Sequence, residues 1–312
     1  MLQHALWHRD LLLGPDVHFS VWGMTGTLAV EDSSFLPEAE RRLWHWIDLI
    51  DASCNRFRSD SEITRVNQHA GESIVVSGTF ERALEAALRA SQATDGLCDP
   101  TVLPALLALG YDRDFDELGD DVARAAPVLP RGVETIHLDT ATHTLVLDPG
   151  TRLDLGASAK ALAVDEVVHE LEAFGGVVVE IGGDVAVAGQ GPSGPWAIGV
   201  SDTLEVRADA PRVILASGGI ATSSLTTRTW RAGGERVNHI IDPRTGSFAV
   251  GPYATASVAA SSCVIANAFA TAALLWGEDA GYHLAQAGWS GRLVRHDTTV
   301  EFVGGWPEEV RA

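Results

Sequence analysis

The sequence predicts an α+β fold. Hydrophobic residues make up 46% of the chain and charged residues 21%, which is enough for a large buried core. The expected strands come in runs with helices inserted between them, and they do not alternate regularly with helices as in a parallel sheet. The length of 312 residues suits about two domains or one large one, and no internal repeat or long linker divides the chain.

The first half of the chain is expected to be rich in helix. Ser34 can cap a helix that has Pro37 in its first turn, and apolar residues then recur at helical spacing. A later helix is expected to stop at Gly96. The expected elements are a strand at 17–32, a helix at 33–54, a polar and turn-rich segment at 55–68, a helix at 79–96 and the start of a third helix within 99–110.

The second half is expected to hold most of the strands. The segment 158–175 has the apolar spacing of an amphipathic helix that ends at Gly175. The other expected elements are short strands within 134–156 with a turn at 139–142, a strand, glycine turn and strand over 177–189, further strands up to 258, a small-residue apolar helix at 263–277, and a tail with a short helix and strands.

Charge and cysteine content exclude several classes of function. The net charge of −20 argues against a nucleic-acid or anionic-membrane surface, because both need basic stripes. Three cysteines without a C-x-x-C pair make a disulfide framework or a zinc cluster improbable. The apolar pieces near the N-terminus are short and broken by charges, so neither a signal peptide nor a membrane span is expected there. We therefore expect a soluble, cytoplasmic protein.

Common catalytic and nucleotide-binding motifs do not explain the sequence. The segment GQGPSG (189–194) matches G-x-G-x-x-G, but Pro192 lies inside it and a strand-like segment follows. A dinucleotide fingerprint must open a helix, so this segment is expected to be a loop between strands. The sequence has no phosphate-binding loop with G-K-[ST], no H-E-x-x-H and no G-x-S-x-G.

Lys160 is the only lysine in the chain, and it lies in the segment LDLGASAKALAVD (153–165). Chance could place it there, since most lysines are solvated. However, the segment runs from a strand into the helix that is expected to begin near Ser158. A helix start offers free N–H groups and the positive end of the dipole, and a lysine there calls for a negative partner such as a phosphate. Lysine also fits narrower sites than arginine does.

Three other groups of polar residues lie at the ends of expected elements. The segment EIGGD (180–184) is either a plain hairpin turn or a place where backbone approaches a ligand. The segment HIIDPRTG (239–246) is a turn flanked by His and Arg. Asn267 and Thr271 are four residues apart on an apolar helix and share one face. They either bond to the backbone or bind something.

These segments together resemble the ApbE family of FAD:protein FMN transferases. The resemblance covers roughly residues 17–305, leaving 1–16 and 306–312 as terminal extensions, and it includes RFRSDSEITRVN, DPTVLPALLALGYD, LDLGASAKALAVD, EIGGDVAVAG, GIATSS and NHIIDPRTG in the family's order. It implies a T-fold-type α+β architecture, with mixed, mainly antiparallel sheets packed with helices. It also implies an FAD cleft between two intimately packed sub-domains.

The resemblance further implies a reaction. A Thr or Ser hydroxyl of an acceptor flavoprotein attacks FAD, AMP leaves, and Mg²⁺ binds at the pyrophosphate. His239 would be the base and Lys160 would act at the diphosphate. The metal would be held by the Ala159 carbonyl, Asn267 and Thr271. The FAD site would comprise Asp99, Gly156, Ser158, Lys160, Asp165, Gly182, Gly183, Asp184, Thr222, His239, Ile240, Asp242 and Arg244.

This sequence departs from the family pattern at three places. Asn267 stands where the metal-binding aspartate is usual, so weaker Mg²⁺ binding is expected. Asn55 replaces a common serine, and the early M-G-T motif reads MTGT (24–27). Two alternatives to transfer therefore stay open. One is an FAD-binding protein without transferase activity, and the other is hydrolysis of FAD to FMN and AMP.

Overall fold

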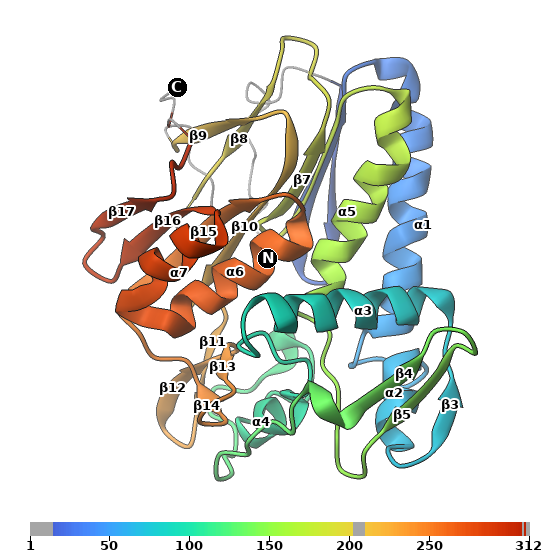
Figure 1. The fold of residues 1–312 in the computed structure, drawn as a ribbon, viewed down its shortest axis with the longest axis vertical. Helices are drawn as coiled ribbons and strands as arrows, with labels where there is room; N and C mark the ends of the chain where they lie inside the picture. The colour runs from blue at the N-terminus through green and yellow to red at the C-terminus, as the bar shows by residue number, and fades with distance from the viewer. Residues whose placement is uncertain (1–14, 202–209, 308, 310–312) are drawn as a thin grey trace.

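The computed structural model describes residues 15–201, 210–307 and 309. Its centre is an eight-stranded sheet in the order β1-β2-β6-β7-β10-β15-β16-β17, and every neighbouring pair is antiparallel (Figure 1). The strands are β1 Asp16–Val21, β2 Met24–Val30, β6 Val177–Ile181, β7 Asp184–Ala188, β10 Ser217–Ser224, β15 Tyr253–Ala260, β16 Ser290–Arg295 and β17 Val300–Val303. Strand β2 thus pairs with a strand far along the chain, Val30 lying opposite Val177.

Helices and small sheets surround this central sheet. The helices are α1 Leu36–Cys54, α2 Glu62–Gln68, α3 Gly78–Ala93, α4 Leu103–Ala108, α5 Ala159–Leu171, α6 Cys263–Trp276 and α7 Ala280–Ala287. The small sheets pair β3 Ser73–Val75 and β4 Ile136–Asp139 with β5 Thr144–Leu147, β8 Trp196–Gly199 with β9 Arg212–Leu215, β11 Thr229–Ala232 with β12 Glu235–Asn238, and β13 Ile241–Asp242 with β14 Ser247–Phe248. Figure 1 places α2, α4 and the β3–β5 sheet below the central sheet.

The two faces of the central sheet carry different layers. Helices α5 and α6 cover one face, and the β8–β9 hairpin lies behind the other (Figure 1). Side chains alternate between these faces along each strand. On β6, Val179 joins the core that includes α5, whereas Val178 joins the core that includes Trp196 of β8. Residues on the helical face of β7 and β10 therefore point toward α5 and α6.

Helix α6 packs unusually close to β10. A Cβ atom added to Gly219 would overlap the backbone of Cys263 at the start of α6. Helix α6 can lie this close because many of its side chains are small, and Ala266, Ala270 and Ala273 are fully buried. Close packing of this kind brings the polar side chains of α6 directly onto the strands below it.

The architecture confirms the predicted α+β class, with antiparallel sheets packed against helices. Two local predictions were wrong. Ser34 was expected to cap the first helix, but α1 begins at Leu36 after a short 3-10 turn, and Asp32 caps that turn by accepting from the Ser34 N–H.

The polar segment 55–68 was expected to form turns, but its second half is helix α2. Ser61 caps this helix by accepting a hydrogen bond from the Thr64 N–H at 3.3 Å, and Ile63 and Val66 bury its apolar face. Two apolar positions were too few to show a period in the sequence.

Within the described residues, every helix is too short or too polar to cross a bilayer. The expected strand at 17–32 is a hairpin, β1 and β2, that turns at Trp22 and Gly23 with positive φ angles of 51° and 70°.

Candidate active site

A buried polar cluster joins α5, β7 and α6. The Lys160 ammonium lies 2.6 Å from Oδ2 of Asp184, whose side chain is only 1% exposed. The Asn267 amide donates from Nδ2 to the other carboxylate oxygen of Asp184 at 2.8 Å. Lys160 also donates to the Ile181 carbonyl at 3.5 Å. Three segments that the sequence singled out separately therefore meet at one carboxylate.

The start of α5 places Lys160 in the first turn of the helix. Helix α5 begins at Ala159, with Ser158 as the residue before it, close to the predicted start. The N–H groups of Ser158 and Ala159 donate to the Leu155 carbonyl, and the Gly156 N–H donates to Asp154 at 2.7 Å. This turn holds the backbone before the helix and aims Lys160 at the β6–β7 connection.

Gly182 and Gly183 make the tight turn between β6 and β7. Their φ angles of 57° and 89° lie in the left-handed region that glycine adopts most readily. A Cβ atom at Gly182 would also overlap the Met24 side chain. The Gly183 N–H donates to Oε1 of buried Glu180 at 2.7 Å, and Oε2 of Glu180 has no hydrogen-bond partner among the described residues. The Gly182 N–H also donates to the Thr25 carbonyl at 3.1 Å, so the turn is a fully bonded hairpin, and open space lies only beside Gly183.

Helix α6 supplies two polar residues on one face, as expected from their spacing. Besides Asn267, Thr271 shares a hydrogen bond of 2.9 Å with the Ser223 hydroxyl on β10. Thr222 instead pairs with Ser257 on β15 at 2.8 Å. Strand alternation turns Thr222 away from α6 and Ser223 toward it. Ser223 was not among the predicted site residues, because the sequence does not show which face of β10 packs against α6.

His239 follows β12 and carries a buried ring nitrogen. Its Nδ1 atom has no hydrogen-bond partner among the described residues. Burial, together with the positive charges of Arg228 and Lys160, lowers the pKa of His239 to about 4, against the effect of a hydrogen bond to the Arg228 backbone, which raises it. The ring is therefore neutral at pH 7 and able to accept a proton. The influence of Lys160 places the histidine within electrostatic reach of the buried cluster, and Arg228 is a neighbour that the sequence interpretation did not identify.

The rest of the HIIDPRTG segment forms a rigid support. Ile240 is buried in the core, its N–H donates to Asn238, and its carbonyl accepts from Ala249. Arg244 makes two hydrogen bonds of 2.8 Å to the carboxylate of Asp242 and one of 2.7 Å to the Leu275 carbonyl near the end of α6. These contacts hold the turn in place.

Asp165 connects the two helices of the site. Its carboxylate accepts hydrogen bonds from the Cys263 N–H at 2.7 Å and the Val264 N–H at 2.9 Å, the first two residues of α6. Burial raises the pKa of Asp165 to about 6, although these two bonds favour the charged form. Asp165 therefore fixes the start of α6 relative to α5.

Asp99 lies between α3 and α4, apart from these contacts. Oδ1 of Asp99 accepts from the N–H and the hydroxyl of Thr101, both at 2.7 Å. Burial raises the pKa of its carboxyl group. The neighbouring Cys98 thiol donates to the Ala268 carbonyl, so this loop does pack against α6.

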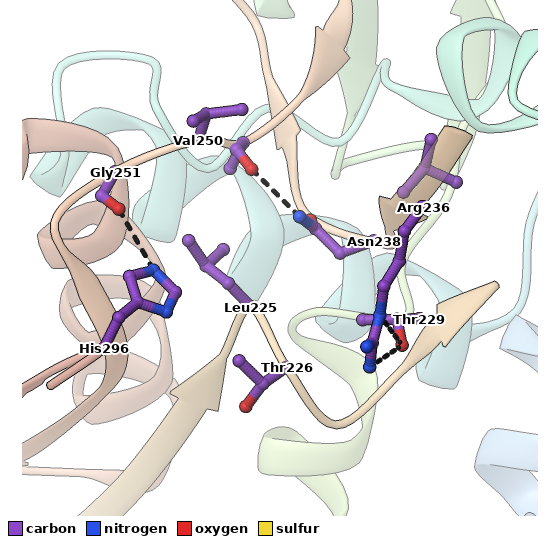
Figure 2. Close-up of a pocket in the computed structure, with 10 residues that line it drawn as sticks. Leu225, Thr226, Thr229, Arg236, Asn238, Val250, Gly251 and His296 are labelled. Atoms are coloured by element: carbon purple, nitrogen blue, oxygen red, sulfur yellow. Dashed lines mark hydrogen bonds between the residues drawn. The ribbon is translucent and has the colours of Figure 1, made fainter. Parts of the chain in front are cut away.

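A cavity of about 450 Å³ opens beside the His239 loop but outside the buried cluster (Figure 2). Figure 2 shows its polar side chains bonded to their neighbours: Arg236 to Thr229, Asn238 to the Ala249 carbonyl, and His296 to the Gly251 carbonyl. The residues that line it are Leu225, Thr226, Thr229, Arg236, Val237, Asn238, Ala249, Val250, Gly251 and His296. None of the predicted site residues lines this cavity, so the buried cluster of Lys160, Asp184 and Asn267 is the better candidate for the active site.

The cluster has the groups that a diphosphate and a hard cation need. A lysine at a helix start supplies positive charge, and the glycine turn leaves open space beside Gly183. Asn267 and Thr271 carry oxygen atoms of the kind that Mg²⁺ prefers, and Asp184 adds a negative charge beside Asn267. Among the described residues, no group of three or more His, Cys, Asp or Glu side chains could hold a metal. A metal here would therefore rely on one carboxylate, neutral oxygens and its substrate.

Comparison with known proteins finds one family. The sequence model of the ApbE family matches residues 15–292. The FAD:protein FMN transferase of Vibrio cholerae is 30% identical over 266 residues, which cover 83% of this chain and 78% of the relative. That of Haemophilus influenzae is 29% identical over 76% of this chain and 72% of the relative. The solved ApbE protein of Thermotoga maritima has a similar fold, with a TM-score of 0.79 at 23% identity, covering 93% of this chain and 97% of its own.

Proposed function

The chain belongs to the ApbE family, and we propose that it transfers the FMN portion of FAD to a protein hydroxyl. AMP is the other product. The observation that carries the proposal is the buried cluster of Lys160, Asp184 and Asn267 within electrostatic reach of a neutral His239. This arrangement combines positive charge for a diphosphate with a base for a hydroxyl group.

Lys160 and the β6–β7 turn bind the diphosphate. The ammonium sits in the first turn of α5, where the helix dipole also favours negative charge. Gly183 leaves room for a phosphate oxygen to approach the backbone, because a Cβ atom there would meet nothing closer than 3.8 Å. Phosphoryl transfer depends largely on positioning and on neutralising charge, and these groups supply both.

His239 accepts the proton of the acceptor hydroxyl. The Thr or Ser oxygen forms a bond to the phosphorus on the FMN side, and the bond from that phosphorus to the bridging oxygen breaks. AMP departs with the bridging oxygen and its negative charge, which Lys160 stabilises. The lowered pKa of His239 keeps its ring unprotonated at pH 7, so it is ready to act as a base.

Mg²⁺ is part of the proposal. The Ala159 carbonyl, the Asn267 amide oxygen and the Thr271 hydroxyl would hold the ion, which when bound would neutralise charge on the pyrophosphate. The buried amide of Asn267 and the half-buried hydroxyl of Thr271, on one face of α6, support this assignment. The acceptor is a flavoprotein with a Thr or Ser site, and we place the reaction in the cytoplasm, which fractionation of expressing cells would test.

Mass spectrometry of candidate acceptor proteins tests the function. The acceptor is incubated with the protein, FAD and Mg²⁺, and the added mass of FMN is sought on a Thr- or Ser-containing peptide. His239→Ala should bind FAD with unchanged affinity yet transfer at least about a hundredfold more slowly, because a base acts on the acceptor and not on bound FAD. His296→Ala, in the separate cavity, is the matched control and should transfer at the parental rate.

The same assay separates the two alternatives. Release of AMP and free FMN without labelled acceptor would identify a hydrolase. FAD binding without AMP release under any Mg²⁺ concentration would identify a binding protein. Parental transfer rates in His239→Ala would show that another group accepts the proton.

A further inference from the structure

The side-chain amide of Asn267 donates a hydrogen bond to a carboxylate, that of Asp184. Nδ2 lies 2.8 Å from Oδ1 of Asp184, and the two side chains are 9% and 1% exposed. A carboxylate only accepts hydrogen bonds, so the amide must face Asp184 with its NH₂ group. The amide oxygen is thereby turned away from Asp184. The orientation of Asn267, which sequence alone leaves open, is fixed by the chemistry of its partner.

Asp184 also carries the charge that residue 267 lacks. Its second oxygen, Oδ2, contacts the Lys160 ammonium at 2.6 Å. One carboxylate thus lies between the lysine that would act on the diphosphate and the amide that would bind the cation. Because the site is buried, the negative charge of Asp184 acts on both neighbours with little screening by water.

We propose that Asp184 is the positioning residue that allows asparagine to serve at position 267. Asp184 orients the amide so that its oxygen faces the cation, and it places a negative charge one hydrogen bond away. The pair of Asp184 and Asn267 then provides what a single carboxylate on α6 would provide. This inference rests on the proposed function, since it concerns the cation of that reaction.

A charge swap between the two positions tests the pairing. In the double variant Asp184→Asn with Asn267→Asp, the amide introduced on β7 can donate its NH₂ group to the carboxylate introduced on α6 and accept from Lys160 with its oxygen. The number of charges and the hydrogen bonds are then the same with the roles exchanged. Each single variant breaks the pattern: Asp184→Asn removes the carboxylate, and Asn267→Asp places two buried carboxylates within hydrogen-bond distance of each other.

Thermal unfolding gives readouts that do not depend on catalysis. One is the melting temperature in chelator. The other is the Mg²⁺ concentration that gives half of the Mg²⁺-dependent rise in melting temperature at saturating FAD. Asp184→Asn should raise this Mg²⁺ concentration by about 10- to 100-fold, as is typical when the partner of a metal ligand is removed. Asn267→Asp should lower the melting temperature in chelator. Its melting temperature should then rise more on addition of Mg²⁺ than that of the parent.

The double variant should recover both values. We expect its Mg²⁺ midpoint within about threefold of the parent, below that of Asp184→Asn, and its melting temperature in chelator above that of Asn267→Asp. Asp51→Asn is the control, because Asp51 lies on α1 and bonds to Arg58 and Trp22, away from this site. It should lower the melting temperature without moving the Mg²⁺ midpoint.

The possible failures are distinct. If Asp184→Asn keeps the parental Mg²⁺ midpoint, or if the swap is no better than the worse single variant, Asp184 does not position Asn267. If Asn267→Asp does not fold in chelator, Asp184→Asn and the swap still decide the question. If the parent itself shows no Mg²⁺ response with FAD, the metal assignment of the proposed function falls as well.

Discussion

Replacing Asp165 by alanine should destabilise the protein by about 3–4 kcal/mol, because the carboxylate holds the start of α6. It accepts two backbone hydrogen bonds, from Cys263 at 2.7 Å and Val264 at 2.9 Å. A hydrogen bond to a charged group contributes roughly 1.5–3 kcal/mol, which gives about 3–6 kcal/mol for two. Ser262 still caps the helix through the Ile265 N–H at 3.3 Å, so the lower part of that range applies.

Urea unfolding at pH 8 is the measurement. The pKa of Asp165 is about 6, so its carboxylate is ionised at this pH and both hydrogen bonds are at full strength. Glu166→Ala is the matched control, because it removes the next carboxylate on α5, whose ion pair with Arg82 spans 3.8 Å. A long, partly exposed ion pair of this kind is worth under about 1 kcal/mol.

The comparison can fail clearly. A loss below about 1 kcal/mol for Asp165→Ala, with an unchanged slope against urea, would show that the cap of Ser262 alone fixes α6. An equal loss in Glu166→Ala would show that any change on this part of α5 has the same effect.

Three further predictions concern the flavin and the buried acids. FAD should bind at least about tenfold more tightly than FMN in flavin-fluorescence titrations, because Lys160 addresses a diphosphate; equal affinities would remove that assignment. Lys160→Arg should weaken FAD binding by roughly tenfold in the same titration, since a planar guanidinium does not fit the space between Asp184 and the Ile181 carbonyl, and unchanged affinity would refute the steric argument. Burial raises the pKa of Glu180 from 4.5 to about 7, so the folded protein keeps a proton that the unfolded chain releases; this stabilisation is complete below about pH 4.5 and is lost as the pH rises through 7. The free energy of unfolding of Glu180→Gln, measured in urea, should therefore rise by about 2–3 kcal/mol relative to that of the parent when the pH is raised from 4.5 to 8. Parallel pH profiles of the two proteins would contradict the raised pKa.

The sequence predicted those features whose signal lies within a single helix or turn. The helix at α5, the glycine turn and the apolar helix α6 each have a local signature of period, cap or breaker, and all three are present. Helix α2 was missed because two apolar residues in seven cannot establish a period. The shared carboxylate of Asp184 could not be predicted, because its contacts depend on how deeply two helices pack on the sheet.

The roles of individual residues show the same limit. Ser223 and Thr222 differ only in which face of β10 they occupy, and that depends on the register with β15. Asp165 stands at the end of the lysine segment, and nothing local indicates that its partners lie about a hundred residues later at Cys263 and Val264. Long-range hydrogen bonds of this kind are visible only once the sheet order is known.

The pairing of β2 with β6 makes the order of synthesis matter. Strand β2 ends at Val30, and the strand that covers its free edge begins at Val177. At about 5–20 residues per second, a ribosome needs roughly 7–30 s to make the chain between them. During that time the β1–β2 hairpin presents an unpaired edge and the apolar side chains of Leu28 and Val30, which later lie in the core. The nascent first half has no finished sheet to fold onto, so its protection from aggregation depends on α1 and on how quickly the second half follows.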